Sequence, residues 1–218
     1  MIRLHHVLPK SDSMGGSRNA AKISIALREL EEQFEVIDHN RDKDLRPPGA
    51  PYRKLNPNGV TPTIEENGLV LWESSAILRY LADTRGRLIP GNLRMRAVAQ
   101  QWLSWEAATF QPSFLAFYFA ASSNVSRESQ DAARGQYVSK VAILDGALGT
   151  TGGFVAGDFS IADIALGAIT PIGFHLGIDL KPYRNVSRWL SSLAMRSAWM
   201  EEEAFRNDME VGRRNGHV

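Results

Sequence analysis

Strand-like patterns occur only in the first part of this 218-residue sequence, and the later part has the spacing of helices. Apolar and β-branched runs predict strands at 2–8, 34–40, 62–66 and 69–73. Helical stripes predict helices at 19–34, 75–84, 94–121, 127–148, 160–174 and 185–206. We therefore expect a β-α-β unit and a β-β-α unit, joined by a Pro-rich connection with room for a short helix, and then an all-helical unit.

The stretch "TRGRLIPGNL" is the one composition break that is typical of a linker. We expect an α/β domain over 1–84, a linker over 85–93 and an all-α domain over 94–218. Ser160, followed three residues later by Asp163, predicts a helix start with a capping box. The polar tail "NDMEVGRRNGHV" is expected to be loose.

Composition excludes several function classes. The net charge of +1 gives no overall attraction to nucleic acid or to an anionic membrane. The first residues lack a signal-peptide pattern and no run could span a bilayer, so a cytoplasmic protein is expected. Without cysteine there is no disulfide and no protein thiol nucleophile, so any thiol must come from a ligand. His5, His6 and His39 lack the carboxylate spacing of a metal site, and we expect them to be structural, with no metal.

Two local signals flank the 62–66 and 69–73 strand pair. Thr61-Pro62 stands at a strand start, where proline is tolerated and a cis bond is plausible. A cis bond would leave the Thr61 backbone free to pair with an extended peptide, but the dipeptide alone favours an ordinary edge proline. Glu73-Ser74-Ser75 precedes a helix, as a plain N-cap or as a site for the two charges of an α-amino acid group. Together the two signals favour a peptide-ligand site.

The run "LNPNGVTPTIEENGLVLWESSAILRYLAD" resembles the glutathione transferase family. It carries Asn-Pro-x-Gly, a strand-initial proline and Glu-Ser before a helix. "FVAGDFSIADIAL" looks like the helical-domain capping motif of that family, and "YRNVSRWLSSLAMRSAW" resembles its closing helix. The resemblance covers nearly the whole chain. It implies a thioredoxin-like N-terminal domain, an all-helical C-terminal domain and, usually, a homodimer.

The resemblance also implies site residues for glutathione as co-substrate. The Thr61 backbone would pair with the cysteinyl unit, and Pro62 would be cis. Glu73 and Ser74 would hold the γ-glutamyl end. Val60 is also expected at the glutathione site, but the family often has a polar or basic residue at this position, which leaves the side-chain contact to the glycyl end open.

The catalytic assignment also follows the family register, which places Ser17 before the first helix and matches Asn19 to a bacterial, nu-like branch. Donors at a helix N-terminus lower the pKa of a thiol, so both side chains would stabilise a glutathione thiolate. The alternative for both residues is a plain N-cap. Ser11 and Ser13 are further candidates in the same loop, and Arg18 would either steady the thiolate or face solvent.

The aromatic run "TFQPSFLAFYFAASS" lies where the family has its electrophile pocket. Phe114 and Phe117 are candidates for a hydrophobic second-substrate pocket, with helical core packing as the alternative. The sequence thus predicts a serine-type glutathione transferase acting on a hydrophobic electrophile. A glutathione-dependent disulfide reductase or peroxidase, and a non-catalytic binding protein of the same fold, remain alternatives.

Overall fold

The computed structural model describes residues 1–8 and 16–218 of the chain. Within them lies a four-stranded sheet with the order β2-β1-β3-β4. Strand β1 (Ile2–His6) runs parallel to β2 (Phe34–Asp38), whereas β3 (Thr63–Glu66) is antiparallel to both β1 and β4 (Leu69–Trp72). The predicted strand positions are confirmed, although β1 is shorter than expected. The β3–β4 turn has positive φ at Asn67 and Gly68, which is why the Asn-Gly pair marks a tight hairpin.

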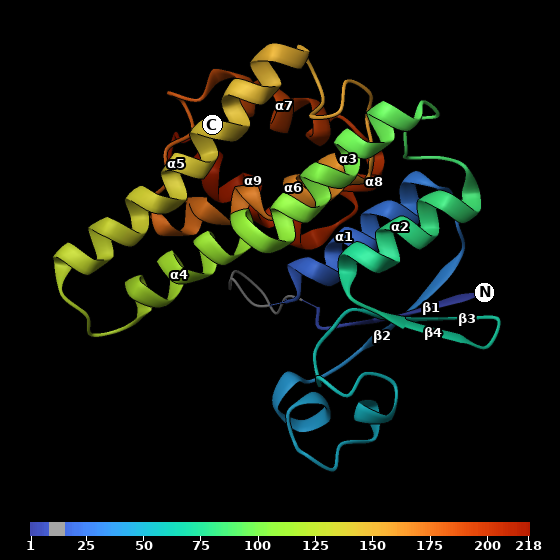
Figure 1. The fold of residues 1–218 in the computed structure, drawn as a ribbon. Coiled ribbons are helices and arrows are strands. Elements are labelled where there is room, and N and C mark those ends of the chain that lie inside the picture. The colour runs from blue at the N-terminus through green and yellow to red at the C-terminus, as the bar shows by residue number, and fades with distance from the viewer. Residues whose placement is uncertain (9–15) are drawn as a thin grey trace.

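Helices α1 (Arg18–Glu29) and α2 (Ser74–Arg85) lie side by side between the sheet and the later helices (Figure 1). Helix α1 ends at Glu29, five residues before Phe34, because Glu31 adopts a positive φ of 61° that turns the chain into β2. Between β2 and β3 the chain forms a π-helical turn, η1 (Arg41–Leu45), and a 3-10 turn, η2 (Pro51–Lys54). This connection projects away from the helical part of the molecule (Figure 1).

The first long helical segment contains a π-helical turn. Helix α3 (Leu93–Trp105) continues through η3 (Glu106–Phe110) into α4 (Gln111–Ser122). The Gln111 N–H donates to the Glu106 carbonyl, one residue further back than in an α-helix. Pro112 follows at once, and proline lacks the N–H that a regular α-helix would use there. Helix α5 (Arg127–Thr151) then packs against α4, as Figure 1 shows.

The predicted continuous helix over 160–174 is wrong. Helix α6 (Ile161–Gly167) ends early and a 3-10 helix, η4 (Thr170–Leu176), follows with Pro171 in its first turn. Proline cannot continue the hydrogen-bond ladder of α6, which explains the break. The capping box at Ser160 and Asp163 is confirmed.

The predicted single helix over 185–206 is also wrong. It divides into α7 (Arg184–Ala194), α8 (Ser197–Met200) and α9 (Glu203–Arg214). Arg196 is extended at the first break, where it forms two hydrogen bonds with Glu29 and lies over the Phe159 ring. No glycine or proline marks this break, so tertiary contacts determine it.

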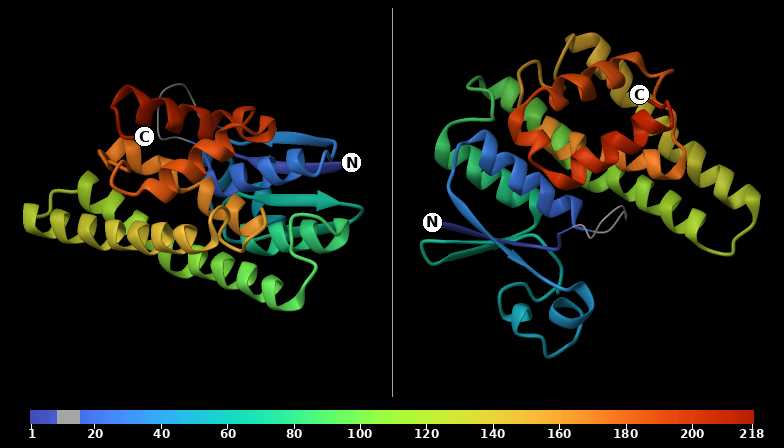
Figure 2. Two further views of the ribbon diagram at one scale, coloured as in Figure 1. Left: turned by 90° about the horizontal axis from the view of Figure 1, so that it is seen from above. Right: turned by 180° about the vertical axis from the view of Figure 1, so that it is seen from behind.

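The tail is ordered rather than loose. Helix α9 buries Phe205, Asp208 and Met209 against the rest of the protein. One continuous hydrophobic core extends from the sheet through α1 and α2 into the later helices, and the two views of Figure 2 show the close packing of these parts. Among the described residues, no helix is long and apolar enough to cross a membrane.

Candidate functional site

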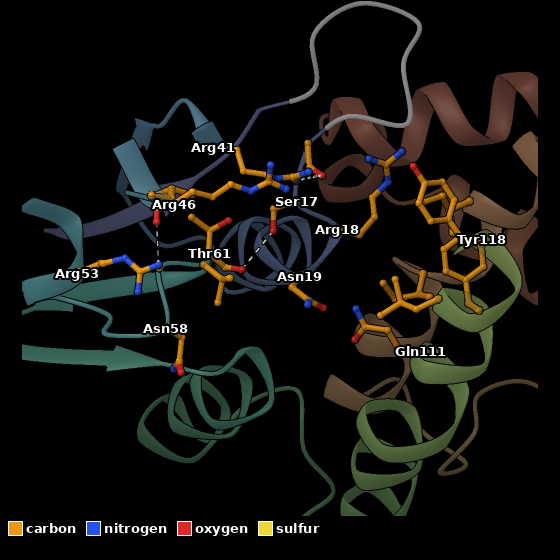
Figure 3. Close-up of a pocket in the computed structure, with 18 residues that line it drawn as sticks. Ser17, Arg18, Asn19, Arg41, Arg46, Arg53, Asn58, Thr61, Gln111 and Tyr118 are labelled. Atoms are coloured by element: carbon orange, nitrogen blue, oxygen red, sulfur yellow. Dashed lines mark hydrogen bonds between the residues drawn. The ribbon is translucent and has the colours of Figure 1, made fainter. Parts of the chain in front are cut away.

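A cavity of about 490 Å³ lies where α1 meets the later helices. One wall comes from the start of α1 and from the connection before β3. The opposite wall comes from α4 and η4. Figure 3 shows Ser17 and Thr61 on the first side, Gln111 and Tyr118 on the other, and Asn19 between them. A cavity with one polar and one apolar wall suits a ligand that carries both kinds of group.

Ser17 is the N-cap of α1, and its side chain is nearly buried. Its hydroxyl oxygen accepts the Ala20 N–H at 3.2 Å, so Ser17 does cap the helix. The hydroxyl proton is directed to the Thr61 carbonyl, but at 3.4 Å this bond is long for an O–H donor. The same hydroxyl can therefore cap the helix with a lone pair and still offer its proton to a ligand in the cavity.

Asn19 is the second residue of α1 and lines the cavity, and its side-chain oxygen is held by a hydrogen bond from Lys22. Lys22 Nζ donates to Asn19 Oδ1 at 2.8 Å and to Glu106 Oε1 at 2.8 Å. Burial lowers the pKa of the Lys22 ammonium and raises the pKa of the Glu106 carboxyl, while the attraction between the two groups opposes both shifts. Glu106 belongs to η3, so this contact joins the two parts of the chain.

The loop before β3 presents backbone to the cavity. The Thr61–Pro62 bond is cis. The Val60 carbonyl accepts the Tyr52 hydroxyl at 2.8 Å and Asn56 Nδ2 at 2.7 Å, which holds this loop in place. The Val60 side chain is 53% exposed and lines the cavity.

Three arginines of the β2–β3 connection also line the cavity, and the sequence analysis did not single them out. Arg53 donates to the backbone carbonyls of residues 46, 47 and 57, so it shapes the loop. Arg41 donates to the Gly16 carbonyl at 3.4 Å, and Arg46 pairs with the exposed Asp42. These bonds are weak or exposed, so Arg41 and Arg46 give the polar wall a positive charge that an anionic group can use.

Arg18 is buried against Asp208 of α9 and does not face solvent, which corrects that alternative. Its Nε and Nη2 donate to the Asp208 carboxylate at 2.9 and 2.7 Å, and His175 Nε2 lies 2.8 Å from the same carboxylate. The pair ties the start of α1 to the last helix. Its geometry is bidentate, the strongest arrangement for this ion pair.

The predicted site residues are only partly brought together. Ser17, Asn19, Val60, Thr61 and Phe114 line one cavity, whereas Pro62, Glu73, Ser74 and Phe117 are not among its lining residues. Glu73 is exposed and precedes α2 with a φ of 73°, and Ser74 is the first residue of that helix.

Phe117 is buried and stacks on Tyr137, as the core alternative expects. The apolar wall also includes Leu115 and Tyr118, which lie on α4 within the aromatic run but were not singled out. It further includes Ile169 and Ile172, which the sequence could not indicate because only the fold brings η4 to α4. Ser11 and Ser13 lie outside the described residues. Among the described residues, no group of three His, Cys, Asp or Glu side chains could hold a metal ion.

Comparison with known proteins identifies the family of the chain. The family "Glutathione S-transferase, N-terminal domain" matches residues 16–84, and "Glutathione S-transferase, C-terminal domain" matches residues 107–196. The glutathione S-transferase GstB of Escherichia coli K12 is 30% identical over 190 residues, which cover 84% of this chain and 91% of that protein. The chain belongs to the glutathione S-transferase family.

Solved structures of glutathione S-transferases share the fold. A theta-class enzyme from Xanthomonas axonopodis pv. citri, solved with glutathione bound, is 27% identical with a TM-score of 0.78, over 92% of this chain and 96% of that chain. A sphingomonad glutathione S-transferase complexed with glutathione is 25% identical with a TM-score of 0.77, over 95% of this chain and 98% of that chain. The mixed sheet and the helical C-terminal part are therefore those of this family.

Proposed function

We propose that this protein is a glutathione transferase that activates the thiol of bound glutathione for attack on a hydrophobic electrophile. The observation that carries the proposal is the pair of polar side chains at the start of α1, one from its N-cap and one from its first turn. The Ser17 hydroxyl and the Asn19 amide line one cavity, opposite an apolar wall. Two similar family members were solved with glutathione, which supports glutathione as the co-substrate.

The tripeptide would lie along the polar wall. In the proposed pose the Thr61 backbone, which precedes Pro62, pairs with the cysteinyl unit. Glu73 takes the γ-glutamyl ammonium, and Ser74 with the free N–H groups of α2 takes the γ-glutamyl carboxylate, because a helix N-terminus favours an anion. Arg41 and Arg46 supply positive charge to the glycyl carboxylate, a role that the Val60 side chain cannot fill.

The chemistry needs a thiolate, and the proposed site supplies donors for it. A free thiol has a pKa of about 8.5, and donors at a helix N-terminus lower it. In the proposed step the Ser17 hydroxyl turns from the Thr61 carbonyl to the sulfur, because a charge-assisted bond is stronger than a 3.4 Å neutral one. The thiol proton leaves to solvent. The sulfur then forms a C–S bond to the electrophile, whose leaving group departs with its bonding electron pair.

The second substrate is proposed to be hydrophobic because of the wall that faces the sulfur site. Phe114 and Leu115 of α4 and Ile169 and Ile172 near η4 supply apolar surface. Tyr118 and Gln111 add polar groups on the same side (Figure 3). An electrophile with an apolar ring or chain and one acceptor fits this wall best.

The decisive experiment is a titration of the ultraviolet thiolate absorbance of bound glutathione against pH. The wild type is expected to show a thiolate well below the ordinary pKa of a thiol. Ser17→Ala should lose this signal, whereas Ser17→Thr, which keeps a hydroxyl, should retain most of it. Glutathione binding without any thiolate would favour a non-catalytic binding protein. No binding at all would reject the proposal.

A second candidate is a glutathione-dependent disulfide reductase or peroxidase. Asn19 favours it, because the amide lies in the cavity beside Ser17, as the resemblance to the nu-like branch implies. Such an enzyme needs no protein cysteine when two glutathione molecules supply both thiols. Assays with a small mixed disulfide or a hydroperoxide, beside an aromatic halide, separate the two activities.

We also propose a homodimer. Strand β4 is one of the two edge strands of the sheet and exposes Leu69, Val70 and Trp72. Exposed apolar side chains on an edge strand favour a protein contact. Sedimentation equilibrium tests this proposal, and a monomer at micromolar concentration would reject it.

A further inference from the structure

Lys22 and Glu106 form an ion pair that is cut off from solvent. Their side chains are 0% and 1% exposed. Neither residue lines the cavity, so the proposed chemistry makes no direct use of them. A buried ion pair is weak support for stability, because desolvating two charges offsets most of their attraction. Stability alone therefore does not explain why the pair is buried at this position.

The pair determines which way the Asn19 amide faces. Lysine has only donors, so the group that meets Lys22 Nζ at 2.8 Å must be the amide oxygen. Within the described chain, the Asn19 amide nitrogen donates no hydrogen bond to another residue. Because Lys22 binds the amide oxygen, the N–H₂ group of Asn19 is available to donate to a ligand in the cavity.

The geometry of the pair also favours this role over simple charge neutralisation. Glu106 Oε2 is buried and has no hydrogen-bond partner. The carboxylate thus uses a single oxygen, and Lys22 divides its donors between Glu106 and Asn19. Glu106 lies in the π-helical turn η3, and such turns place side chains where a regular helix would not.

We propose that the Lys22–Glu106 pair is a positioning device that fixes the Asn19 amide so that its N–H₂ group donates to the sulfur of bound glutathione. The inference rests on the proposed function. It makes stabilisation of the thiolate depend on how the helical part of the chain docks on α1. Lys22 and Glu106 act through Asn19 and touch no substrate.

The test replaces both charged groups at once, because removing the two together leaves no unpaired buried charge. Lys22→Met/Glu106→Gln is made in the wild-type and in the Asn19→Ala background. The thiol pKa of bound glutathione is measured by thiolate absorbance. Affinity is measured with S-methylglutathione, which has no thiol to titrate. In the wild-type background the thiol pKa should rise by about half a unit, an approximately threefold smaller thiolate fraction, with little change in affinity.

The Asn19→Ala background decides whether the pair acts through Asn19. In that background, adding Lys22→Met/Glu106→Gln should give the same thiol pKa as Asn19→Ala alone. An equal rise in both backgrounds would overturn the inference, as would no rise in the wild-type background while Asn19→Ala itself gives one. If neither Ser17→Ala nor Asn19→Ala moves the thiol pKa, the proposed function fails first, and the inference falls with it.

A matched control uses another ion pair that joins α1 to the helical part. Arg196 and Glu29 form two hydrogen bonds, at 2.7 and 2.6 Å, away from Asn19. Arg196→Met/Glu29→Gln should leave the thiol pKa unchanged, and a rise equal to that of the test variant would show a general effect of docking and overturn the inference. If the first double variant does not fold, Lys22→Gln/Glu106→Gln, a polar pair of shorter reach, takes its place with the same expected results.

Discussion

Replacing Asp208 by Asn tests whether the last helix is held by the ion pair to Arg18. The Asp208 side chain is 0% exposed and accepts two bonds from Arg18, with His175 as a further neighbour. Asn keeps the volume but removes the charge, and it turns one acceptor into a donor that faces the guanidinium. Two charge-assisted bonds are affected, each worth about 1.5–3 kcal/mol.

The expected loss in the free energy of unfolding is about 3–5 kcal/mol, the range for removing one partner of a buried ion pair. Domains of ordinary stability have only about 5–15 kcal/mol in total, so the variant should be markedly weakened. For a chain of this size each kcal/mol lowers Tm by about 2–4 °C, which gives a fall of about 6–20 °C.

The assay is urea unfolding followed by tryptophan fluorescence, with the slope checked for two-state behaviour. Glu210→Gln is the matched control, because Glu210 lies on the same helix and its pair with Arg214 is 59–60% exposed. That control should cost at most about 0.5 kcal/mol. A loss for Asp208→Asn below about 1 kcal/mol, close to that of the control, would refute the assigned role of the ion pair.

Three further predictions concern packing, capping and pH. Gly167→Ala should cost about 1–3 kcal/mol, because a Cβ would meet the Trp199 ring at 2.5 Å; calorimetry showing no loss would contradict this packing. Ser17→Ala should lower the free energy of unfolding by about 1 kcal/mol through the lost cap, and Ser17→Thr should recover most of it in the same urea assay. Burial raises the pKa of Asp163 to about 6 from its ordinary value near 4, so the folded state retains a proton that the unfolded state has released. The contribution of Asp163 to stability should therefore fall between pH about 4 and about 6, and Asp163→Asn should remove that fall; an unchanged pH profile would contradict it.

Local sequence signals were sufficient where the structure depends on neighbouring residues. The Asn67-Gly68 hairpin and the Ser160–Asp163 capping box follow from short-range backbone chemistry, and both were predictable. The ends of the later helices were not. The break at Arg196 depends on Glu29, which is 167 residues away along the chain, and no local residue marks it.

The same distinction holds at the candidate site. Ser17, Asn19 and Thr61 could be named because they lie in recognisable motifs. The arginines of the β2–β3 connection and the apolar residues of η4 could not, because only the folded chain brings them to one cavity. The tail was misjudged for a related reason. Its composition is polar, which suggested exposure to water. Asp208 is instead buried, and its carboxylate pairs with a buried arginine.

The π-helical turn between α3 and α4 has a consequence for how this chain tolerates insertions and deletions. A π turn holds one more residue than an α turn, and each residue of a helix rotates the next face by about 100°. Deleting one residue, such as the exposed Ala107 or Ala108, would shorten the π turn to the length of an α turn. It would nevertheless turn Phe114 away from the cavity relative to α3. A one-residue deletion that looks minor in a sequence alignment would therefore change which side chains of α4 line the cavity.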